Sequence, residues 1–125
     1  MKSIIFLCTG NYYRSRFCEL YFNHHAQRRD LSWRADSRGL APDITVFRNP
    51  GPLSPYTLEA LRTLGIRLDE TPRRPLTVYP ADLLAADRII ALSRHEHEPM
   101  LKAVSYTHLR AHETDSYLVC RLLLE

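Results

Sequence analysis

Two residues near the start of the sequence, Cys8 and Arg14, have types and spacing that suit phosphate chemistry. They are separated by five residues in the segment Cys-Thr-Gly-Asn-Tyr-Tyr-Arg-Ser, residues 8–15. The guanidinium of an arginine can hold two oxygens of a phosphate in a bidentate fork. A positive charge beside a cysteine favours the thiolate, which is the nucleophilic form. The spacing therefore predicts an anion site with Cys8 at its floor.

The segments on either side of residues 8–15 have the patterns needed to position such a site. Residues 2–7 form a β-branched and aromatic run that predicts a buried central strand, and from Ser15 the apolar residues recur at helical spacing. A loop that curls into a helix N-terminus points successive backbone N–H groups inward, where they and the helix dipole bind anions. Gly10 and Asn11 tolerate the left-handed backbone that the curl requires.

The rest of the sequence alternates strand and helix patterns. After the first helix we predict a strand at 33–37, a loop at 39–52, a helix from Ser54-Pro55 to Gly65, an irregular connection at 68–79, a short helix at 80–86, a strand at 88–92 and a helix at 94–102. Alternation of this kind is typical of a parallel sheet with helices on both faces. The predicted fold class is therefore α/β.

Composition narrows the classes of protein and partner. A chain of 125 residues that is 45% hydrophobic and 25% charged is typical of one globular domain. The net charge of +3 is mild and the arginines are dispersed, which disfavours nucleic acid and suits a small anionic substrate. No run approaches the ~20 apolar residues of a membrane span, so we expect no membrane partner and a cytoplasmic location.

Cysteines and histidines outside the segment 8–15 offer little sign of metal or redox chemistry. His24 and His25 are adjacent, so they point to different faces of a helix, and we expect His95 and His97 to be solvated. Cys18 has the character of a small core residue. We therefore expect no metal and no cofactor.

The segment 8–15 resembles the signature of the low-molecular-weight protein tyrosine phosphatases: Cys, any residue, Gly-Asn, two variable residues, Arg, then Ser or Thr. Further stretches that resemble this family are Ser-Arg-Gly at 37–39, Gly-Pro at 51–52, Gly-Ile at 65–66 and Ala-Asp-Arg-Ile-Ile-Ala-Leu at 86–92. The resemblance covers residues 1–103. It implies a flavodoxin-like three-layer sandwich and hydrolysis of phosphotyrosine or another aryl phosphate through a phosphocysteine.

The resemblance also implies a role for each residue of the segment. Cys8 would attack phosphorus, Arg14 would hold the phosphate oxygens, and Ser15 would hydrogen-bond the thiolate. The phosphate-binding loop would comprise Thr9, Gly10, Asn11, Tyr12, Tyr13 and Arg14. Asn11 and Ser37 would brace this loop from behind. The expected partners are a phosphorylated protein or a small aryl phosphate, with inorganic phosphate, sulfate or vanadate as inhibitors.

Three positions depart from the family pattern. Tyr13 stands where many members have a second cysteine, so protection of the nucleophile by an internal disulfide should be absent. Tyr12 either lines the mouth of the site and stacks on an aromatic leaving group or is simply exposed. A histidine that commonly braces the loop is replaced near Thr71.

The sequence changes character at residue 104. Residues 104–114 resemble a translation of the transposon-end DNA of sequencing libraries, and residues 117–124 resemble a translated flow-cell adapter. We therefore expect a truncated domain at 1–103, lacking its last strand and helix, followed by a non-native tail at 104–125. The family's general acid is an Asp, typically in an Asp-Pro pair, and no such pair occurs in the sequence, so we expect impaired hydrolysis.

Two alternatives to hydrolysis remain open. The first is a non-catalytic phosphate-binding module, which would bind anions without turnover. The second is a thiol-coupled arsenate reductase on the same loop, which would need two further redox cysteines; with the expected tail discounted, only Cys8 and Cys18 remain.

Overall fold

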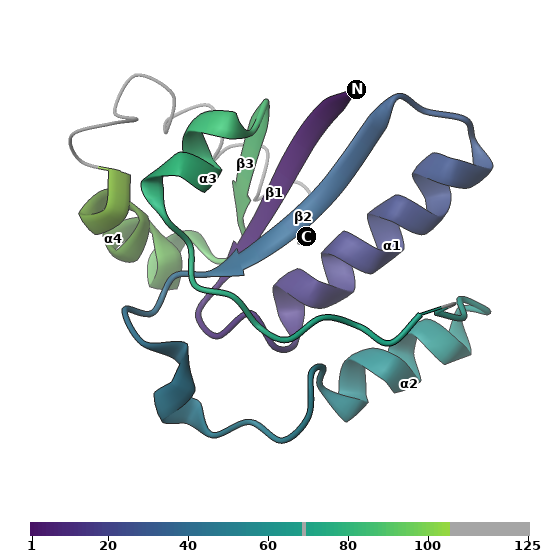
Figure 1. Cartoon of the computed structure of the whole chain (residues 1–125), viewed down its shortest axis with the longest axis horizontal. Helices are drawn as coiled ribbons and strands as arrows, with labels where there is room; N and C mark the ends of the chain where they lie inside the picture. The colour runs from purple at the N-terminus through teal and green to yellow at the C-terminus, as the bar shows by residue number, and fades with distance from the viewer. Residues whose placement is uncertain (69, 106–125) are drawn as a thin grey trace.

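The computed structural model describes residues 1–68 and 70–105 (Figure 1). In this part of the chain three parallel strands form one sheet in the order β2-β1-β3, with β1 (Lys2–Cys8) in the middle. It pairs over its whole length with β2 (Trp33–Gly39) and over four residues with β3 (Arg88–Ala91). The first predicted strand is therefore central, as its continuous apolar run indicated.

Helices cover both faces of this sheet (Figure 1). The helical segments are α1 (Arg14–Arg28), the 3-10 turn η1 (Ile44–Phe47), α2 (Pro55–Thr63), α3 (Pro80–Ala85) and α4 (Arg94–Ser105). In Figure 1, α1 lies on one side of the strands, while α3 and α4 lie on the other. The predicted three-layer α/β sandwich is confirmed for the described residues.

Each face of the sheet carries its own apolar core, because successive side chains of a strand point to opposite faces. Ile4 and Phe6 pack in a cluster with Phe22 of α1. Ile5 and Leu7 pack in a second cluster with Leu83 of α3 and with Leu101 of α4. Burial on both faces explains why β1 has no polar alternation, and it holds the C-terminus of β1 rigidly between two layers.

The helix with the clearest boundary signals in the sequence is α2. The Ser54 hydroxyl accepts a hydrogen bond from the Tyr56 N–H at 3.1 Å, and Pro55 is the first helical residue. After the helix Gly65 has φ +78°, and the Ile66 N–H donates to the Leu61 carbonyl at 2.8 Å. The structure therefore confirms the N-cap and the glycine stop that the sequence predicts.

Other predicted boundaries shift by a few residues. Helix α1 begins at Arg14, one residue early, and β2 continues to Gly39. Helix α4 extends to Ser105, past the expected domain boundary at residue 103. The rest of the expected tail, including Asp115 and Cys120, lies outside the described residues. Among the described helices, none has the length and apolar character needed to cross a membrane.

Candidate active site

The segment 8–15 runs from the carboxyl end of β1 into the first turn of α1, as predicted. Cys8 is the last residue of β1 and is buried. Asn11 adopts a left-handed backbone with φ +52°, which turns the loop toward the helix. The carboxyl end of β2 approaches closely, because a Cβ on Gly39 would lie 3.0 Å from the Thr9 carbonyl oxygen and 2.9 Å from Ile44. Gly39 therefore lets β2 support the loop directly.

The candidate nucleophile has a hydroxyl as its neighbour. Cys8 Sγ lies 3.0 Å from Ser15 Oγ, and both residues are buried. Ser15 Oγ also accepts a hydrogen bond from Asn11 Nδ2 at 2.9 Å. Since Asn11 supplies that proton, the hydroxyl proton of Ser15 can point at the sulfur. This arrangement stabilises a thiolate by a charge-assisted hydrogen bond.

Asn11 is fully buried and has partners on both atoms of its side-chain amide. Its Nδ2 donates to Ser15 Oγ and to Ser37 Oγ, each at 2.9 Å. Its Oδ1 accepts from the Leu76 N–H at 2.9 Å and from Arg73 Nη1 at 3.0 Å. The structure thus brings Asn11, Ser15 and Ser37 together behind the loop, where a shorter or charged side chain could not make the same four contacts.

Arg73 completes this support and was not singled out in the sequence. Its Nη2 donates to the Ser37 carbonyl at 2.7 Å and contacts Asp36 Oδ1 at 2.9 Å and Glu19 Oε1 at 3.3 Å. Arg73, two residues after Thr71, therefore braces the residues behind the loop. The sequence predicts an irregular surface connection at 68–79, and the two adjacent arginines between Pro72 and Pro75 are its only sign of this role.

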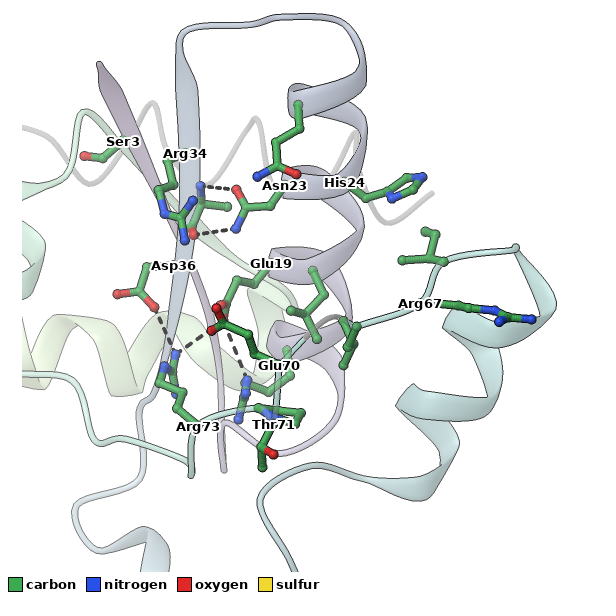
Figure 2. Close-up of a pocket in the computed structure, with 17 residues that line it drawn as sticks. Ser3, Glu19, Asn23, His24, Arg34, Asp36, Arg67, Glu70, Thr71 and Arg73 are labelled. Carbon is green, nitrogen blue, oxygen red and sulfur yellow. Dashed lines mark hydrogen bonds and ion pairs between the residues drawn. The ribbon is translucent and has the colours of Figure 1, made fainter.

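Figure 2 shows the polar cavity behind this network, with a volume of about 730 Å³. It lies between α1, β2 and the chain that follows α2, and Glu19, Asp36 and Arg73 meet at one end of it. Arg16 is also in its wall, buried, with Nη1 donating to the Pro52 carbonyl at 3.0 Å. Cys8 and Arg14 do not line this cavity, so it is separate from the face on which an anion would meet the sulfur.

Arg14, predicted to hold phosphate, holds a carboxylate of this chain instead. Its Nη2 and Nη1 contact Glu96 Oε1 and Oε2 at 3.0 and 3.1 Å, so the pair is bidentate. The Thr9 hydroxyl also donates to Glu96 Oε1. These hydrogen bonds from Arg14 and Thr9 lower the pKa of Glu96 to about 2, although both side chains of the ion pair are about two-fifths exposed. Glu96 thus occupies the guanidinium that an anion would need.

The expectation that His97 is solvated is wrong. Its side chain is fully buried, because α4 turns it beneath the loop while the neighbouring His95 is exposed. Its Nδ1 accepts from the Ser93 N–H at 3.0 Å, so the neutral ring carries its proton on Nε2. That atom lies 3.2 Å from Thr9 Oγ1 and 3.4 Å from Glu96 Oε1. Burial lowers the pKa of His97, which favours this neutral form.

The two tyrosines of the loop differ in their surroundings. Tyr12 is half-buried and its hydroxyl donates to the Pro50 carbonyl at 2.6 Å, which fixes the ring against the chain before α2. Tyr13 is 47% exposed and its ring centroid lies 6.0 Å from that of Tyr56. Tyr13 therefore lies at the surface beside α2.

Comparison with known proteins agrees with this geometry. The family model described as low molecular weight phosphotyrosine protein phosphatase matches residues 3–119. A protein-arginine-phosphatase from Bacillus subtilis is 34% identical over 99 residues, which are 78% of this chain and 59% of that protein. The chain thus spans less than two thirds of that relative.

Solved structures of phosphatases and related proteins have the same fold as this chain. YfkJ from Bacillus subtilis superposes with a TM-score of 0.73 at 27% identity, covering 99% of this chain and 88% of that one. A low molecular weight protein tyrosine phosphatase from T. tengcongensis superposes with a TM-score of 0.70 at 25% identity, covering 93% and 71%. The match of sequence, fold and loop geometry leads to one conclusion: the chain belongs to the low molecular weight phosphotyrosine protein phosphatase family.

Proposed function

We propose that this chain hydrolyses phosphate monoesters through a covalent phosphocysteine on Cys8. The observation that carries the proposal is the 3.0 Å contact between Cys8 Sγ and Ser15 Oγ at the floor of a loop that returns through Arg14. Family membership supports the reaction class. The expected substrate is phosphotyrosine in a protein or another aryl phosphate. The name of the protein-arginine-phosphatase relative adds phosphoarginine as a candidate.

The proposed reaction has two displacement steps. In the first, the Cys8 thiolate forms a bond to phosphorus while the bond to the leaving group breaks and the leaving atom takes up a proton. In the second, water attacks the phosphocysteine and releases inorganic phosphate and the thiolate. Arg14 and the loop N–H groups stabilise the charge on the phosphoryl oxygens, and the Ser15 hydroxyl stabilises the departing thiolate.

A carboxylate must leave Arg14 before this reaction can begin. Glu96 and a phosphate compete for the same guanidinium, because each can present two negatively charged oxygens to its fork. Exchange is feasible because the pair lies at the surface, where ion pairs contribute little to stability. In the free chain, Glu96 therefore occupies the phosphate-binding guanidinium of Arg14.

Binding without turnover is the second candidate function, and it is favoured by the absence from the sequence of an Asp-Pro pair that could supply the general acid. Steady-state hydrolysis of p-nitrophenyl phosphate, with inorganic phosphate as competitor, separates the two. We expect slow turnover with competitive inhibition by phosphate, and loss of both in Arg14→Ala. Phosphate binding by calorimetry with no detectable turnover would establish the binding module instead.

The same assay separates hydrolysis from the thiol-coupled reductase. The described cysteines are Cys8, which is buried, and Cys18, which is partly buried, and they are not joined to each other by a disulfide. We expect Cys18→Ser to hydrolyse the substrate at the wild-type rate and Cys8→Ser to have no hydrolytic activity. Equal loss of activity in the two variants would indicate a dithiol mechanism.

A further inference from the structure

The carboxylate of Glu96 already does one thing that a substrate-binding group would do, because it holds a guanidinium at the mouth of the loop. Glu96 lies in the first turn of α4, which follows β3 at the same edge of the sheet as Cys8 (Figure 1). The guanidinium that it holds belongs to Arg14, in a bidentate geometry at 3.0 and 3.1 Å. When a phosphoryl group binds Arg14, this carboxylate must find other partners.

The two oxygens of Glu96 are held differently. Oε1 accepts from the Thr9 hydroxyl and lies 3.4 Å from His97 Nε2, and both of these groups are anchored in the loop or beneath it. Both oxygens also contact Arg14, Oε1 through Nη2 and Oε2 through Nη1. When Arg14 turns to a phosphoryl group, Oε1 keeps Thr9 and His97, so the carboxylate stays at the mouth and Oε2 becomes available to a new donor.

The nature of the group that carries the phosphate then decides the charge balance. A phosphotyrosine brings two negative charges and a neutral ring, so it leaves the Glu96 carboxylate unpaired beside a like charge. A phosphoarginine brings a guanidinium next to the phosphoryl group. That guanidinium offers Glu96 the same planar fork that Arg14 withdraws, so the exchange replaces one ion pair by two and the Glu96 carboxylate stays paired.

We propose that Glu96 is a specificity-determining residue that favours phosphoryl groups carried by a guanidinium, as in phosphoarginine, over those carried by a neutral ring. The inference rests on the proposed function, because it assumes that phosphoryl groups bind at Arg14. The lowered pKa of Glu96 is consistent with a carboxylate that stays ionised in this role.

The test compares Glu96→Gln with the wild-type chain on two peptides of one sequence, one carrying phosphoarginine and the other phosphotyrosine. Glutamine keeps the shape of the side chain and removes its charge. We expect the ratio of kcat/KM for phosphoarginine to kcat/KM for phosphotyrosine to fall about tenfold or more, as for the loss of one charge-assisted hydrogen-bonded pair. Phosphotyrosine turnover should rise, since Arg14 is then released from a charged competitor.

A matched control exists on the same helix. Glu98 pairs with Arg94 and Lys102 at 3.3 Å each, so Glu98→Gln removes the same charge from α4. This variant should keep the wild-type ratio. If Glu96→Gln instead raised both activities by the same factor, Glu96 would be a simple inhibitory contact and the inference would be overturned.

Binding measurements separate this inference from the proposed function. In the Cys8→Ser chain, calorimetry with free phosphoarginine and free phosphotyrosine should show tighter binding of phosphoarginine, and adding Glu96→Gln should remove the preference. Equal affinities in Cys8→Ser would overturn the inference whether or not the chain turns substrate over. A clear preference without any turnover in the wild-type chain would overturn the proposed function and leave this inference standing.

Discussion

Two side chains at the site, Asn11 in the loop and Glu96 in α4, have different roles. Asn11 contributes the left-handed turn, and its amide links the loop to β2 and to the chain before α3 through Ser37 and Leu76. Glu96 contributes a carboxylate that occupies Arg14 in the free chain. The first is a permanent support and the second is exchangeable, so substitutions at the two positions should behave differently.

Replacing Asn11 tests the support. Asn11→Ala leaves the amide partners of a buried side chain unsatisfied, and we expect it to destabilise the fold by about 2 kcal/mol or more and to abolish phosphate binding. Asn11→Gly keeps the left-handed backbone and should be less destabilising, yet equally inactive. Urea denaturation and phosphate calorimetry measure the two effects. Normal phosphate affinity in Asn11→Gly would show that the amide contacts are dispensable.

The Arg14–Glu96 pair predicts a pH dependence of stability. The pKa of Glu96 in the folded chain, about 2, lies below the ordinary value of 4.5. The ion pair therefore stabilises the fold above about pH 4.5, and this stabilisation is lost as the pH falls toward 2. The unfolding free energy of the wild-type chain minus that of Glu96→Gln should therefore shrink over this window. Urea unfolding of both chains between pH 6 and pH 2 measures it. A pH-independent difference would contradict the pair's role.

At the scale of elements, the end of β2 lies against the loop with no room for a side chain between them. A Cβ on Gly39 would meet the Thr9 carbonyl oxygen, which is backbone and cannot turn away. Gly39→Ala should therefore displace the loop and reduce kcat/KM by about 10-fold to 100-fold, the cost of a misplaced catalytic group. Stopped assays on p-nitrophenyl phosphate measure this.

The control for this substitution is Gly65→Ala. Gly65 has φ +78° with no atom near its missing Cβ, so the substitution costs roughly 1–2 kcal/mol of backbone strain at a point away from the loop. Its kcat/KM should stay at the wild-type value. Comparable activity losses in the two variants would mean that general destabilisation, rather than displacement of the loop, accounts for the effect of Gly39→Ala.

The elements that the sequence predicts well are those with local signals. The run at 2–7, the Gly-Asn turn and the Ser54-Pro55 helix start each have patterns confined to a few residues, and the structure confirms them. His97 and Arg73 meet the loop from 88 and 62 residues away, at Thr9 and Asn11. Such contacts follow from the order β2-β1-β3, which no local pattern states. The position of Glu96 just after a strand that ends at the same sheet edge was the usable clue.

At the scale of the whole molecule, the parallel sheet explains why these distant residues meet. The carboxyl ends of parallel strands lie at one edge, and in open α/β sheets the ligand site forms there. The loop after β1, Gly39 at the end of β2 and the helix after β3 all contribute to the site.

The tail beyond residue 103 remains our proposal. Helix α4 is described to Ser105, and the family match extends to residue 119. We propose that residues 104–125 are translated adapter DNA, and the reading frame beyond residue 103 from an independent clone tests this directly. The same adapter-like residues in that clone would show that they are native.

A missing general acid would make the rate depend strongly on the leaving group. A positioned acid typically contributes roughly 10²–10⁴-fold by protonating the leaving oxygen, and the sequence has no Asp-Pro pair to provide one. We predict a steep fall in kcat/KM along a series of aryl phosphates of rising leaving-group pKa, with alkyl phosphates hardly cleaved. A shallow dependence would show that another group of this chain supplies the proton.

The most direct test of the central claim is to trap the covalent intermediate. Acid quenching of the wild-type chain during turnover of p-nitrophenyl phosphate, followed by mass spectrometry of its peptides, should find one phosphoryl group on the peptide that contains Cys8. The Cys8→Ser chain should show neither the modified peptide nor turnover. A phosphoryl group on any other residue, or continued turnover in Cys8→Ser, would contradict the assignment of Cys8 as the nucleophile.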